Sequence, residues 1–250
     1  MENLAYRTAE LERYFSRNRI SWPQFYESER QVIEAVWPGG NPDVLDIGCG
    51  CGGLGLALHE RFGADRYTGV EINAEAAASA RQLNPRASIL AGDFLGLGSD
   101  ELAPDSFDLV FSLSCIDWNL NFDQMLAKAW SMVKPGGDLI ASLRLTTAAG
   151  INDIGRSYQY INYEGQREGE IAPYVVLNCS DVARRAVRLG ASRMFAYGYY
   201  GAPSATAVTP FAQLCFAALA LRKPIGSERL KPQLHLPDDI SGPMSAAASA

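Results

Sequence analysis

The chain has 250 residues, a formal net charge of −6 at pH 7 and a hydrophobic content of 48%. This length supports one large α/β domain with a core of its own, and the composition argues against bulk disorder. The acidic balance, without a dense block of lysine or arginine, argues against nucleic acid as the main partner. The longest apolar run, 214–221, is too short to span a bilayer, and the charged N-terminus shows no signal region. We therefore expect a cytoplasmic protein that does not enter a membrane.

The five cysteines are irregularly spaced, and only Cys49 and Cys51 lie close together. No group of cysteine and histidine has the spacing of a zinc site, so we expect no metal. We interpret the thiols as small, half-buried side chains in a reducing compartment.

Residues 1–42 precede the first expected core strand and form an N-terminal helical arm. Ser28 and Gln31 fit a capping box for a short helix, which Pro38-Gly39-Gly40 ends. The arm also holds aromatic residues without a clear period, at Tyr14, Phe15, Trp22, Phe25 and Tyr26. Two interpretations stay open: the arm packs against the domain, or it is a lid over a ligand pocket.

The stretch 44–55, VLDIGCGCGGLG, places one acid, Asp46, in an apolar strand that runs into a glycine-rich turn. Glycine permits positive φ and the close approach of a ligand to the backbone. The helix that begins near Leu54 presents free N–H groups at the same turn. The turn therefore predicts a site for a nucleotide-like ligand.

Strands and helices alternate after this turn. The pattern predicts a helix at 54–62, strands at 66–71, 88–91, 107–113 and 138–145, an alanine-rich helix capped by Asn73, and an amphipathic helix from Phe122. Such alternation specifies a Rossmann-like, doubly wound sheet of mostly parallel strands.

A long, polar and tyrosine-rich insertion, 146–178, interrupts this rhythm, and such insertions often carry function. A helix capped by Ser180 follows it. Strands at 192–199 and 212–221 are then joined by a loop too short for a crossover helix, which predicts an antiparallel last strand.

The expected organisation is therefore an arm over 1–42 and a domain over 43–223 with a seven-stranded sheet. Within that domain the insertion is expected to form the acceptor side. Proline recurs from Pro224 onward, and we expect a loose tail over 224–250.

Glycine spacing alone fits a nicotinamide or flavin enzyme. Gly48, Gly50 and Gly53 satisfy the dinucleotide pattern, and Glu71 lies near the distance expected of a ribose-binding acid. Two observations count against this ligand. Asp46 would repel a pyrophosphate but accept hydrogen bonds from an ammonium group. In addition, no tyrosine is followed four residues later by lysine, the pair of short-chain dehydrogenases.

The successive motifs of the chain resemble those of class I S-adenosylmethionine-dependent methyltransferases. They are VLDIGCGCGG, GVEINAEAAASAR, AGDFL, FDLVFSLSCIDW and LAKAWSMVKPGGDLI. The resemblance covers residues 43–145 and, more loosely, 181–222, where the closing strand pair fits that fold. It implies S-adenosyl-L-methionine as the cofactor.

The resemblance also implies roles for residues at the carboxyl ends of the strands, where open α/β sheets bind ligands. The methionine part would be surrounded by Asp46, Gly48, Cys49, Gly50 and Gly52. The sulfonium and its methyl group would be lined by residues 112–115, including Ser112 and Ser114.

For the nucleoside, the resemblance implies that Glu71 holds both ribose hydroxyls with its two oxygens. Ile72 would pack on the adenine face, and Asp93 would accept from the adenine amino group, with Phe94 beside it. The alternative for Glu71 and Asp93 is that both are solvated turn acids.

Methyl transfer from a sulfonium is an in-line displacement that needs a general base only for a weakly nucleophilic hydroxyl. Neither His59, in a helix that leads away from the cofactor, nor His235, in the tail, suits this role. Asp117 and Asn119, just past the fourth strand, are the candidates for acid/base chemistry or acceptor orientation. Helix capping or loop hydrogen bonding is their alternative.

Arg144 lies inside an apolar segment near the carboxyl end of the fifth strand. Our hypothesis is that its planar fork binds an anionic group of the substrate, and a structural ion pair is the alternative. Tyr158, Tyr160 and Tyr163 are candidates to line the acceptor pocket. No Asn/Asp-Pro-Pro-Tyr run follows the fourth strand, which disfavours methylation of adenine or glutamine amino groups.

The sequence therefore predicts an enzyme that transfers a methyl group from S-adenosylmethionine to oxygen or nitrogen of a small molecule, with an anionic acceptor as one option. An NAD(P)-dependent oxidoreductase and a non-catalytic S-adenosylmethionine-binding protein remain as alternatives. The sequence does not indicate the oligomeric state or the acceptor.

Overall fold

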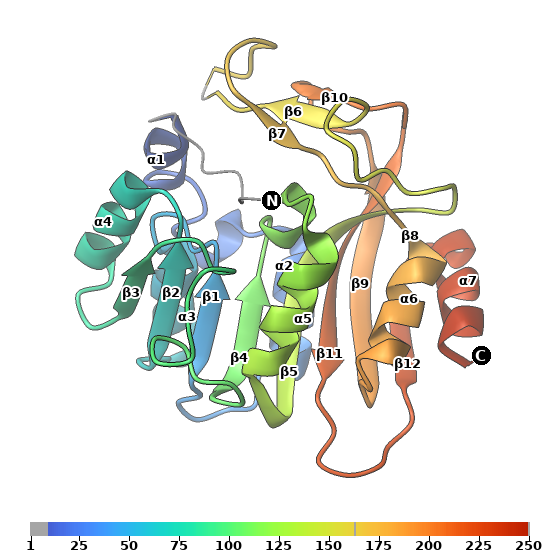
Figure 1. Ribbon diagram of the computed structural model, residues 1–250, viewed down its shortest axis with the longest axis horizontal. Coiled ribbons are helices and arrows are strands. Elements are labelled where there is room, and N and C mark those ends of the chain that lie inside the picture. The colour runs from blue at the N-terminus through green and yellow to red at the C-terminus, as the bar shows by residue number, and fades with distance from the viewer. Residues whose placement is uncertain (1–9, 163, 250) are drawn as a thin grey trace.

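The computed structural model describes residues 10–162 and 164–249, and a mixed sheet runs through its centre (Figure 1). The first five strands are β1 (Val44–Ile47), β2 (Tyr67–Glu71), β3 (Ser88–Ala91), β4 (Phe107–Ser112) and β5 (Val133–Thr146). The later strands of this sheet are β8 (Leu177–Asn178), β9 (Arg193–Gly201), β11 (Leu214–Arg222) and β12 (Lys231–His235).

The strand order is β12-β9-β11-β5-β4-β1-β2-β3, and β8 pairs with the end of β5. Strands β1 to β5 are mutually parallel, whereas β11 is antiparallel to both β5 and β9. The expected fold class is confirmed, with nine strands instead of seven. The order reverses between β1 and β4, and in such folds ligands bind at the carboxyl ends of the strands on either side of this point.

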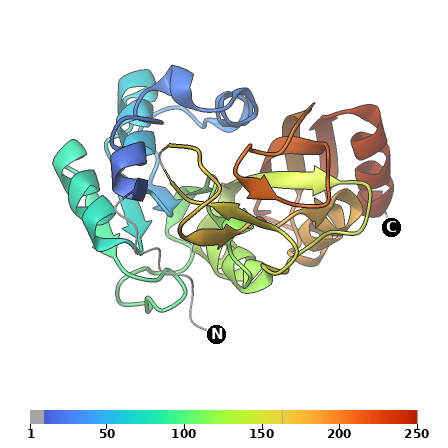
Figure 2. The ribbon, with the colours of Figure 1, turned by 90° about the horizontal axis from the view of Figure 1, so that it is seen from above.

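Helices cover both faces of the sheet (Figure 2). One hydrophobic core contains residues of α2 (Glu27–Val36), α3 (Gly53–Phe62) and α4 (Ala74–Leu83). The other contains residues of α5 (Phe122–Met132), α6 (Cys179–Arg188) and α7 (Asp238–Ser249). The central strands are buried on both sides, which explains their almost continuous apolar sequence.

A second, smaller sheet lies above the carboxyl edge of the main sheet (Figure 1). Its order is β10 (Ala207–Val208), β6 (Tyr158–Tyr160) and β7 (Ile171–Pro173), all antiparallel. Two of these strands come from the insertion, and β10 comes from the loop between β9 and β11. We call this unit the upper sheet.

The arm begins at the same upper edge of the molecule, where α1 (Glu10–Phe15) lies (Figure 1), and continues to α2, which packs on the main sheet. It contains the short 3-10 helix η1 (Trp22–Gln24) between α1 and α2. The Cys51 thiol donates to the Glu12 carbonyl (3.6 Å), and the Ser79 hydroxyl donates to the Glu12 carboxylate (2.9 Å). These contacts hold α1 against the glycine turn and α4.

Two expected helix caps are wrong, and one is confirmed. Ser28 is buried inside α2, whose first turn is closed by the Tyr26 N–H donating to Glu29. In α6 the cap is Asn178, whose side chain accepts from the Asp181 N–H, and not Ser180. Asn73 caps α4 as expected. Both wrong assignments were two residues too late, because helix boundaries inferred from a cap pattern are uncertain by one or two residues.

The expected loose tail is instead folded onto the domain. Strand β12 pairs in parallel with β9, and α7 packs beside α6 with Ile240 and Met244 fully buried. A proline in β12 is tolerated because the strand lies at the edge of the sheet. Among the described residues, no helix is both long enough and apolar enough to cross a membrane.

Candidate functional site

A cavity of about 310 Å³ lies at the carboxyl ends of β1, β2 and β4, beside the point where the strand order reverses. The glycine turn after β1 forms one wall. Gly48, Gly50 and Gly52 have φ values of +74°, +55° and +81°, as the sequence predicts. The backbone N–H groups of Gly48 and Cys49 donate to the Val70 carbonyl, which fixes the turn on β2.

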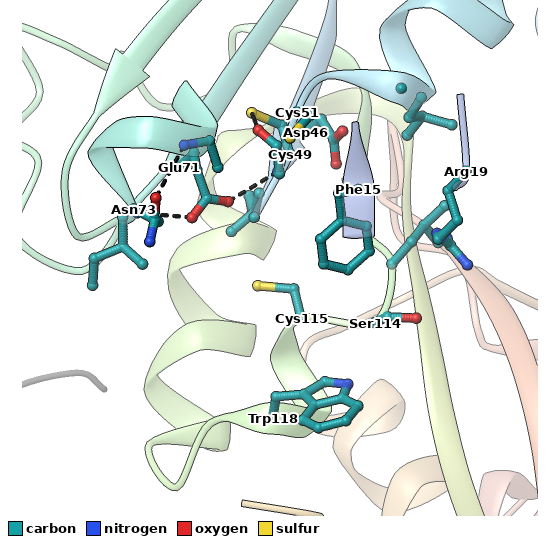
Figure 3. A pocket seen from close by; sticks show the side chains of 18 of the residues that line it. Phe15, Arg19, Asp46, Cys49, Cys51, Glu71, Asn73, Ser114, Cys115 and Trp118 are labelled. Atoms are coloured by element: carbon teal, nitrogen blue, oxygen red, sulfur yellow. Dashed lines mark hydrogen bonds between the residues drawn. The ribbon is translucent and has the colours of Figure 1, made fainter. Parts of the chain in front are cut away.

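Glu71 ends β2 and connects two walls of this cavity (Figure 3). Its Oε2 accepts from the Gly50 N–H (2.9 Å), and its Oε1 accepts from the Asn73 N–H (2.8 Å). The residue is only 8% exposed, and burial raises the pKa of its carboxyl group against these two hydrogen bonds. Each oxygen retains a further lone pair, so the carboxylate can accept from two neighbouring hydroxyls.

Asp46 lies at the end of β1 on the floor of the cavity. Its Oδ2 accepts from the Tyr67 hydroxyl at 2.6 Å. Burial raises the pKa of Asp46 to about 7, although the Tyr67 hydrogen bond and the charge of Arg19 both lower it. A cationic group bound here would favour the ionised carboxylate.

Ile72, Asp93 and Phe94 line the cavity on the side of β2 and β3. Asp93 Oδ1 accepts from the Leu95 N–H (3.0 Å), which shapes the loop after β3. Lys128 of α5, which the sequence analysis missed, supports this loop from behind. Its ammonium group donates to the carbonyls of residues 94, 95 and 97, and it lies 4.9 Å from the Phe94 ring centre.

The segment after β4 supplies the opposite wall through Ser114, Cys115, Trp118 and Asn119. Ser114 has φ +50°, and its N–H donates to the Ser142 hydroxyl. Ser112, in contrast, is buried beneath this wall, where its hydroxyl accepts from the Ile116 N–H. Ser112 is therefore not among the lining residues, although the resemblance placed it there.

Asp117 and Arg144 lie outside the cavity lining and bind each other. Arg144 Nε donates to Asp117 Oδ2 (2.8 Å), and Nη2 donates to the Asp117 carbonyl (2.8 Å). The guanidinium lies against the rings of Trp118 and Tyr174, 4.5 and 3.8 Å from their centres. This geometry corresponds to the structural ion pair that the sequence left open as an alternative.

The arm and the upper sheet cover the cavity from two sides. The arm contributes Tyr14, Phe15, Asn18, Arg19, Phe25 and Tyr26, and β6 of the upper sheet with the loop that follows it contributes residues 159–162. Tyr158 faces away from this lining and packs on Tyr160, 5.6 Å between ring centres. Tyr163, the third tyrosine candidate, lies outside the described residues.

The described part of the site holds no reactive thiol, no histidine and no cluster of metal ligands. Burial raises the pKa of the thiols of Cys49, Cys51 and Cys115, so they stay protonated and poorly nucleophilic at neutral pH. His59 lies on the surface, 3.0 Å from Asp65, and His235 lies exposed on β12. No cluster of potential metal ligands occurs among the residues that the structure describes.

Comparison with known proteins gives one consistent match. Residues 44–137 match the family described as "Methyltransferase domain". A trans-aconitate 2-methyltransferase of Deinococcus radiodurans is 34% identical over 116 residues, which is 42% of each chain. A malonyl-[acyl-carrier protein] O-methyltransferase of Calditerrivibrio nitroreducens is 24% identical over 176 residues, 66% of this chain and 67% of that protein.

The chain thus aligns with about two fifths of the first of these relatives. Among solved structures, phosphoethanolamine N-methyltransferase 2 of Haemonchus contortus, in complex with S-adenosyl-L-methionine, superposes with a TM-score of 0.59. It is 16% identical and is covered over 56% of its length by 84% of this chain. This likeness shows a shared fold.

Proposed function

The chain belongs to the class I S-adenosylmethionine-dependent methyltransferases, and we propose that it transfers the cofactor's methyl group to an oxygen or nitrogen of a small molecule. The observation that carries the proposal is the position of Glu71. Its buried carboxylate is fixed by backbone N–H groups of both the glycine turn and the β2–α4 turn, with oxygens at the cavity wall. A ribose diol is the group that such a carboxylate suits.

The residues around Glu71 fit the remaining parts of S-adenosylmethionine. Ile72 offers an apolar surface for the adenine, and Asp93 offers an acceptor for its amino group. Asp46 offers a carboxylate for the ammonium of the methionine part, and Ser114 and Cys115, which line the same cavity, would surround the sulfonium.

When bound, S-adenosylmethionine supplies a methyl group that is already activated by the sulfonium. The protein's contribution is then to position the acceptor and to exclude water. We infer that the arm and the upper sheet do both. The arm would act as the lid, and the insertion would form the acceptor side, with Trp118, Asn119, Gln159, Tyr160 and Asn162 as its lining.

We infer further that the acceptor atom is nucleophilic without help from a base. Among the described lining residues there is no histidine, and the acids Asp46, Glu71 and Asp93 are needed by the cofactor. A carboxylate is already ionised at neutral pH, and an amine that binds in its neutral form carries a free lone pair, so both react without deprotonation by the enzyme. The relative named trans-aconitate 2-methyltransferase favours a carboxylate. The Gln159 amide carries two N–H groups, of which one donates to the Ser204 hydroxyl (3.3 Å), so the other is suited to orient that carboxylate.

A small molecule is the acceptor that the charge of the site favours. Of the described lining residues, Arg19 is the one with a cationic side chain, whereas a nucleic acid partner would require a wider basic surface.

Calorimetric titration with S-adenosylhomocysteine and, separately, with NAD tests the cofactor. We expect S-adenosylhomocysteine to bind, and binding of NAD alone would overturn the proposal in favour of an oxidoreductase. The acceptor is tested with methyl-labelled S-adenosylmethionine and two panels, one of small carboxylic acids and one of primary amines. A carboxylate product releases labelled methanol in alkali, whereas an N-methyl product does not. Binding without transfer to either panel would leave only the function of a cofactor-binding protein.

A further inference from the structure

The arm brings one guanidinium group into the cavity, and most of its donors are not used by the protein. The Arg19 side chain is 14% exposed and lines the cavity across from Glu71 (Figure 3). Its Nη2 donates to Glu29 Oε1 at 3.0 Å, and no other hydrogen bond to the guanidinium occurs within the described residues. Because a guanidinium carries five N–H groups, donors remain for a ligand.

The residues around Arg19 hold its guanidinium in one place. Glu29 is fully buried, and its second oxygen is occupied by the Tyr26 N–H. The Phe25 and Tyr26 rings lie 4.7 and 5.3 Å from the Arg19 Cζ. An arginine fixed by a buried acid and two rings loses little further freedom when it binds an anion.

The backbone of Arg19 is also built for this position. Arg19 has φ +60°, which is unusual for a side chain other than glycine. Gln24 stabilises the strained turn by accepting from the N–H groups of Ile20 and Ser21 and donating to the Arg17 carbonyl. The turn sits directly on the start of α3, because a Cβ atom on Gly53 would collide with the Arg19 carbonyl oxygen. Strain that is held by so many contacts commonly marks a functional residue.

Arg19 and Asp46 line the same end of the cavity, and their charges act on each other. Asp46 uses Oδ2 for Tyr67, and no bond to its Oδ1 is formed within the described residues. The cavity therefore offers one carboxylate oxygen and several guanidinium N–H groups that are near enough for their charges to interact but do not bind each other. An α-amino acid, with an ammonium and a carboxylate on one carbon, has the matching charges.

We propose that Arg19 binds the carboxylate of the cofactor's methionine part while Asp46 binds its ammonium group. The inference rests on the proposed cofactor and adds to it a residue outside the region that matches the methyltransferase family. It assigns to the arm a direct role in holding the cofactor. It also means that Arg19 is occupied during turnover and is not the group that recognises the acceptor.

The test compares two ligands that differ by one group. S-adenosylhomocysteine has the carboxylate, and its decarboxylated analogue keeps the ammonium but lacks the carboxylate. With the unaltered protein, calorimetry should show the analogue binding ten- to a hundredfold more weakly. Arg19→Met should bind S-adenosylhomocysteine only as tightly as the unaltered protein binds the analogue. The affinity of Arg19→Met for the analogue should differ less than twofold from that of the unaltered protein, because the analogue has no carboxylate for Arg19 to bind.

Two further variants make the result decisive. Arg17→Met removes the same charge from an exposed position of the arm and should change neither affinity. Arg19→Met leaves the buried Glu29 carboxylate unpaired and should lower the melting temperature. Arg19→Met/Glu29→Gln removes that carboxylate, so it should have a higher melting temperature than Arg19→Met and the same loss of S-adenosylhomocysteine affinity.

Equal affinities of the two ligands for the unaltered protein would overturn the proposal. So would an unchanged S-adenosylhomocysteine affinity in both Arg19 variants, which would assign Arg19 to the acceptor. Failure of the unaltered protein to bind S-adenosylhomocysteine at all would instead overturn the proposed function.

Discussion

The carboxylate of Asp117 and the guanidinium of Arg144 form an ion pair, with 2.7 Å between Nη2 and Oδ2, behind the wall of the cavity. Their side chains are 6% and 4% exposed. Asp117 Oδ1 and Arg144 Nη1 have no hydrogen-bond partner within the described residues, so the pair satisfies only part of its own bonding capacity. Its place between η2 (Ile116–Trp118) and the insertion indicates that it supports Trp118 and Asn119 from outside the cavity.

Breaking this pair should therefore cost stability and leave cofactor binding unchanged. Arg144→Met leaves a buried, unpaired carboxylate, and we expect the free energy of unfolding to fall by about 3–5 kcal/mol. Urea denaturation measures this loss. Arg144→Met/Asp117→Asn should lose less, and Arg184→Met, at the half-exposed pair with Asp181, should lose no more than about 1 kcal/mol. A stable Arg144→Met protein with weakened S-adenosylhomocysteine binding would contradict the structural role.

Replacing Glu71 should weaken binding of the cofactor. Glu71→Gln turns one acceptor oxygen into an N–H donor that must face the N–H of either Gly50 or Asn73. A lost hydrogen bond to a charged group corresponds to about 1.5–3 kcal/mol, so we expect a loss of at least about tenfold in S-adenosylhomocysteine affinity by calorimetry. Glu75→Gln, at an exposed position one turn further along, is the matched control and should bind as the unaltered protein does. If both variants bind S-adenosylhomocysteine equally well, Glu71 does not bind the ribose.

Cofactor affinity should depend on pH through Asp46. Burial raises the pKa of Asp46 to about 7, and the ammonium group requires its ionised form. Between pH 8 and pH 6 we therefore expect S-adenosylhomocysteine to bind about tenfold more weakly, since the proton competes with the ligand. Asp46→Asn should bind weakly at both pH values. A pH-independent affinity in the unaltered protein would show that Asp46 does not contact the ammonium.

The same shift predicts how stability of the ligand-free protein varies with pH. Because the pKa of Asp46 is higher in the folded state than its ordinary value of 3.8, the folded state binds the extra proton between these two values. This contribution is fully present below pH 3.8 and is lost as the pH rises through about 7. Asp46→Asn should therefore be more stable than the unaltered protein at pH 8, as measured by its melting temperature.

Lys128 should contribute to cofactor affinity without touching the cofactor. Its ammonium group holds the loop of residues 94–97 through three carbonyl oxygens. Lys128→Met leaves these oxygens without their donor, and we expect about a three- to tenfold loss of S-adenosylhomocysteine affinity, which corresponds to about 1 kcal/mol. Lys231→Met, on the exposed edge of β12, is the control. Identical affinities in the two variants would mean that the loop keeps its shape without Lys128.

The fold of the C-terminal segment can be tested by one deletion of core volume. Ile240 of α7 is fully buried, and Ile240→Ala should lower the free energy of unfolding by about 2–5 kcal/mol. Ile225 is 83% exposed, and the same substitution there should change stability by less than about 0.5 kcal/mol. Urea denaturation of both variants decides whether α7 is part of the folded domain.

The sequence predicted the half of the molecule whose signals are local. Apolar strands, glycine turns and the Asn73 cap are set by residues within a few positions of each other, and the strand and helix order up to β5 is confirmed. The prediction of a loose tail over 224–250 was wrong because α7 is stabilised by packing on α6, a contact that no local sequence pattern indicates. The proline and alanine content of this segment suggested a loop, whereas an edge strand and a packed helix accommodate both.

At the site, the sequence could predict that a residue lies at the end of a strand, but not whether its side chain points into the cavity or away from it. Asp117 and Arg144 both lie near carboxyl ends of central strands, and both turned away from the cavity to meet each other. A charge of opposite sign 27 positions away was the one available signal for this pairing. Lys128 was missed because its partners lie in a loop more than 30 positions earlier in the chain. Arg19 was missed although Glu29 is only ten positions away, because the turn between them follows neither helix nor strand spacing.

The upper sheet is assembled from two stretches that are far apart in the chain. Strands β6 and β7 come from the insertion, while β10 comes from the β9–β11 loop and pairs with β6 through Ala207 and Val208. Exchange of the insertion alone with that of another methyltransferase would leave β10 without its partner strand. Redirecting the protein to a different acceptor by loop grafting therefore requires that both stretches be transplanted together, as one unit.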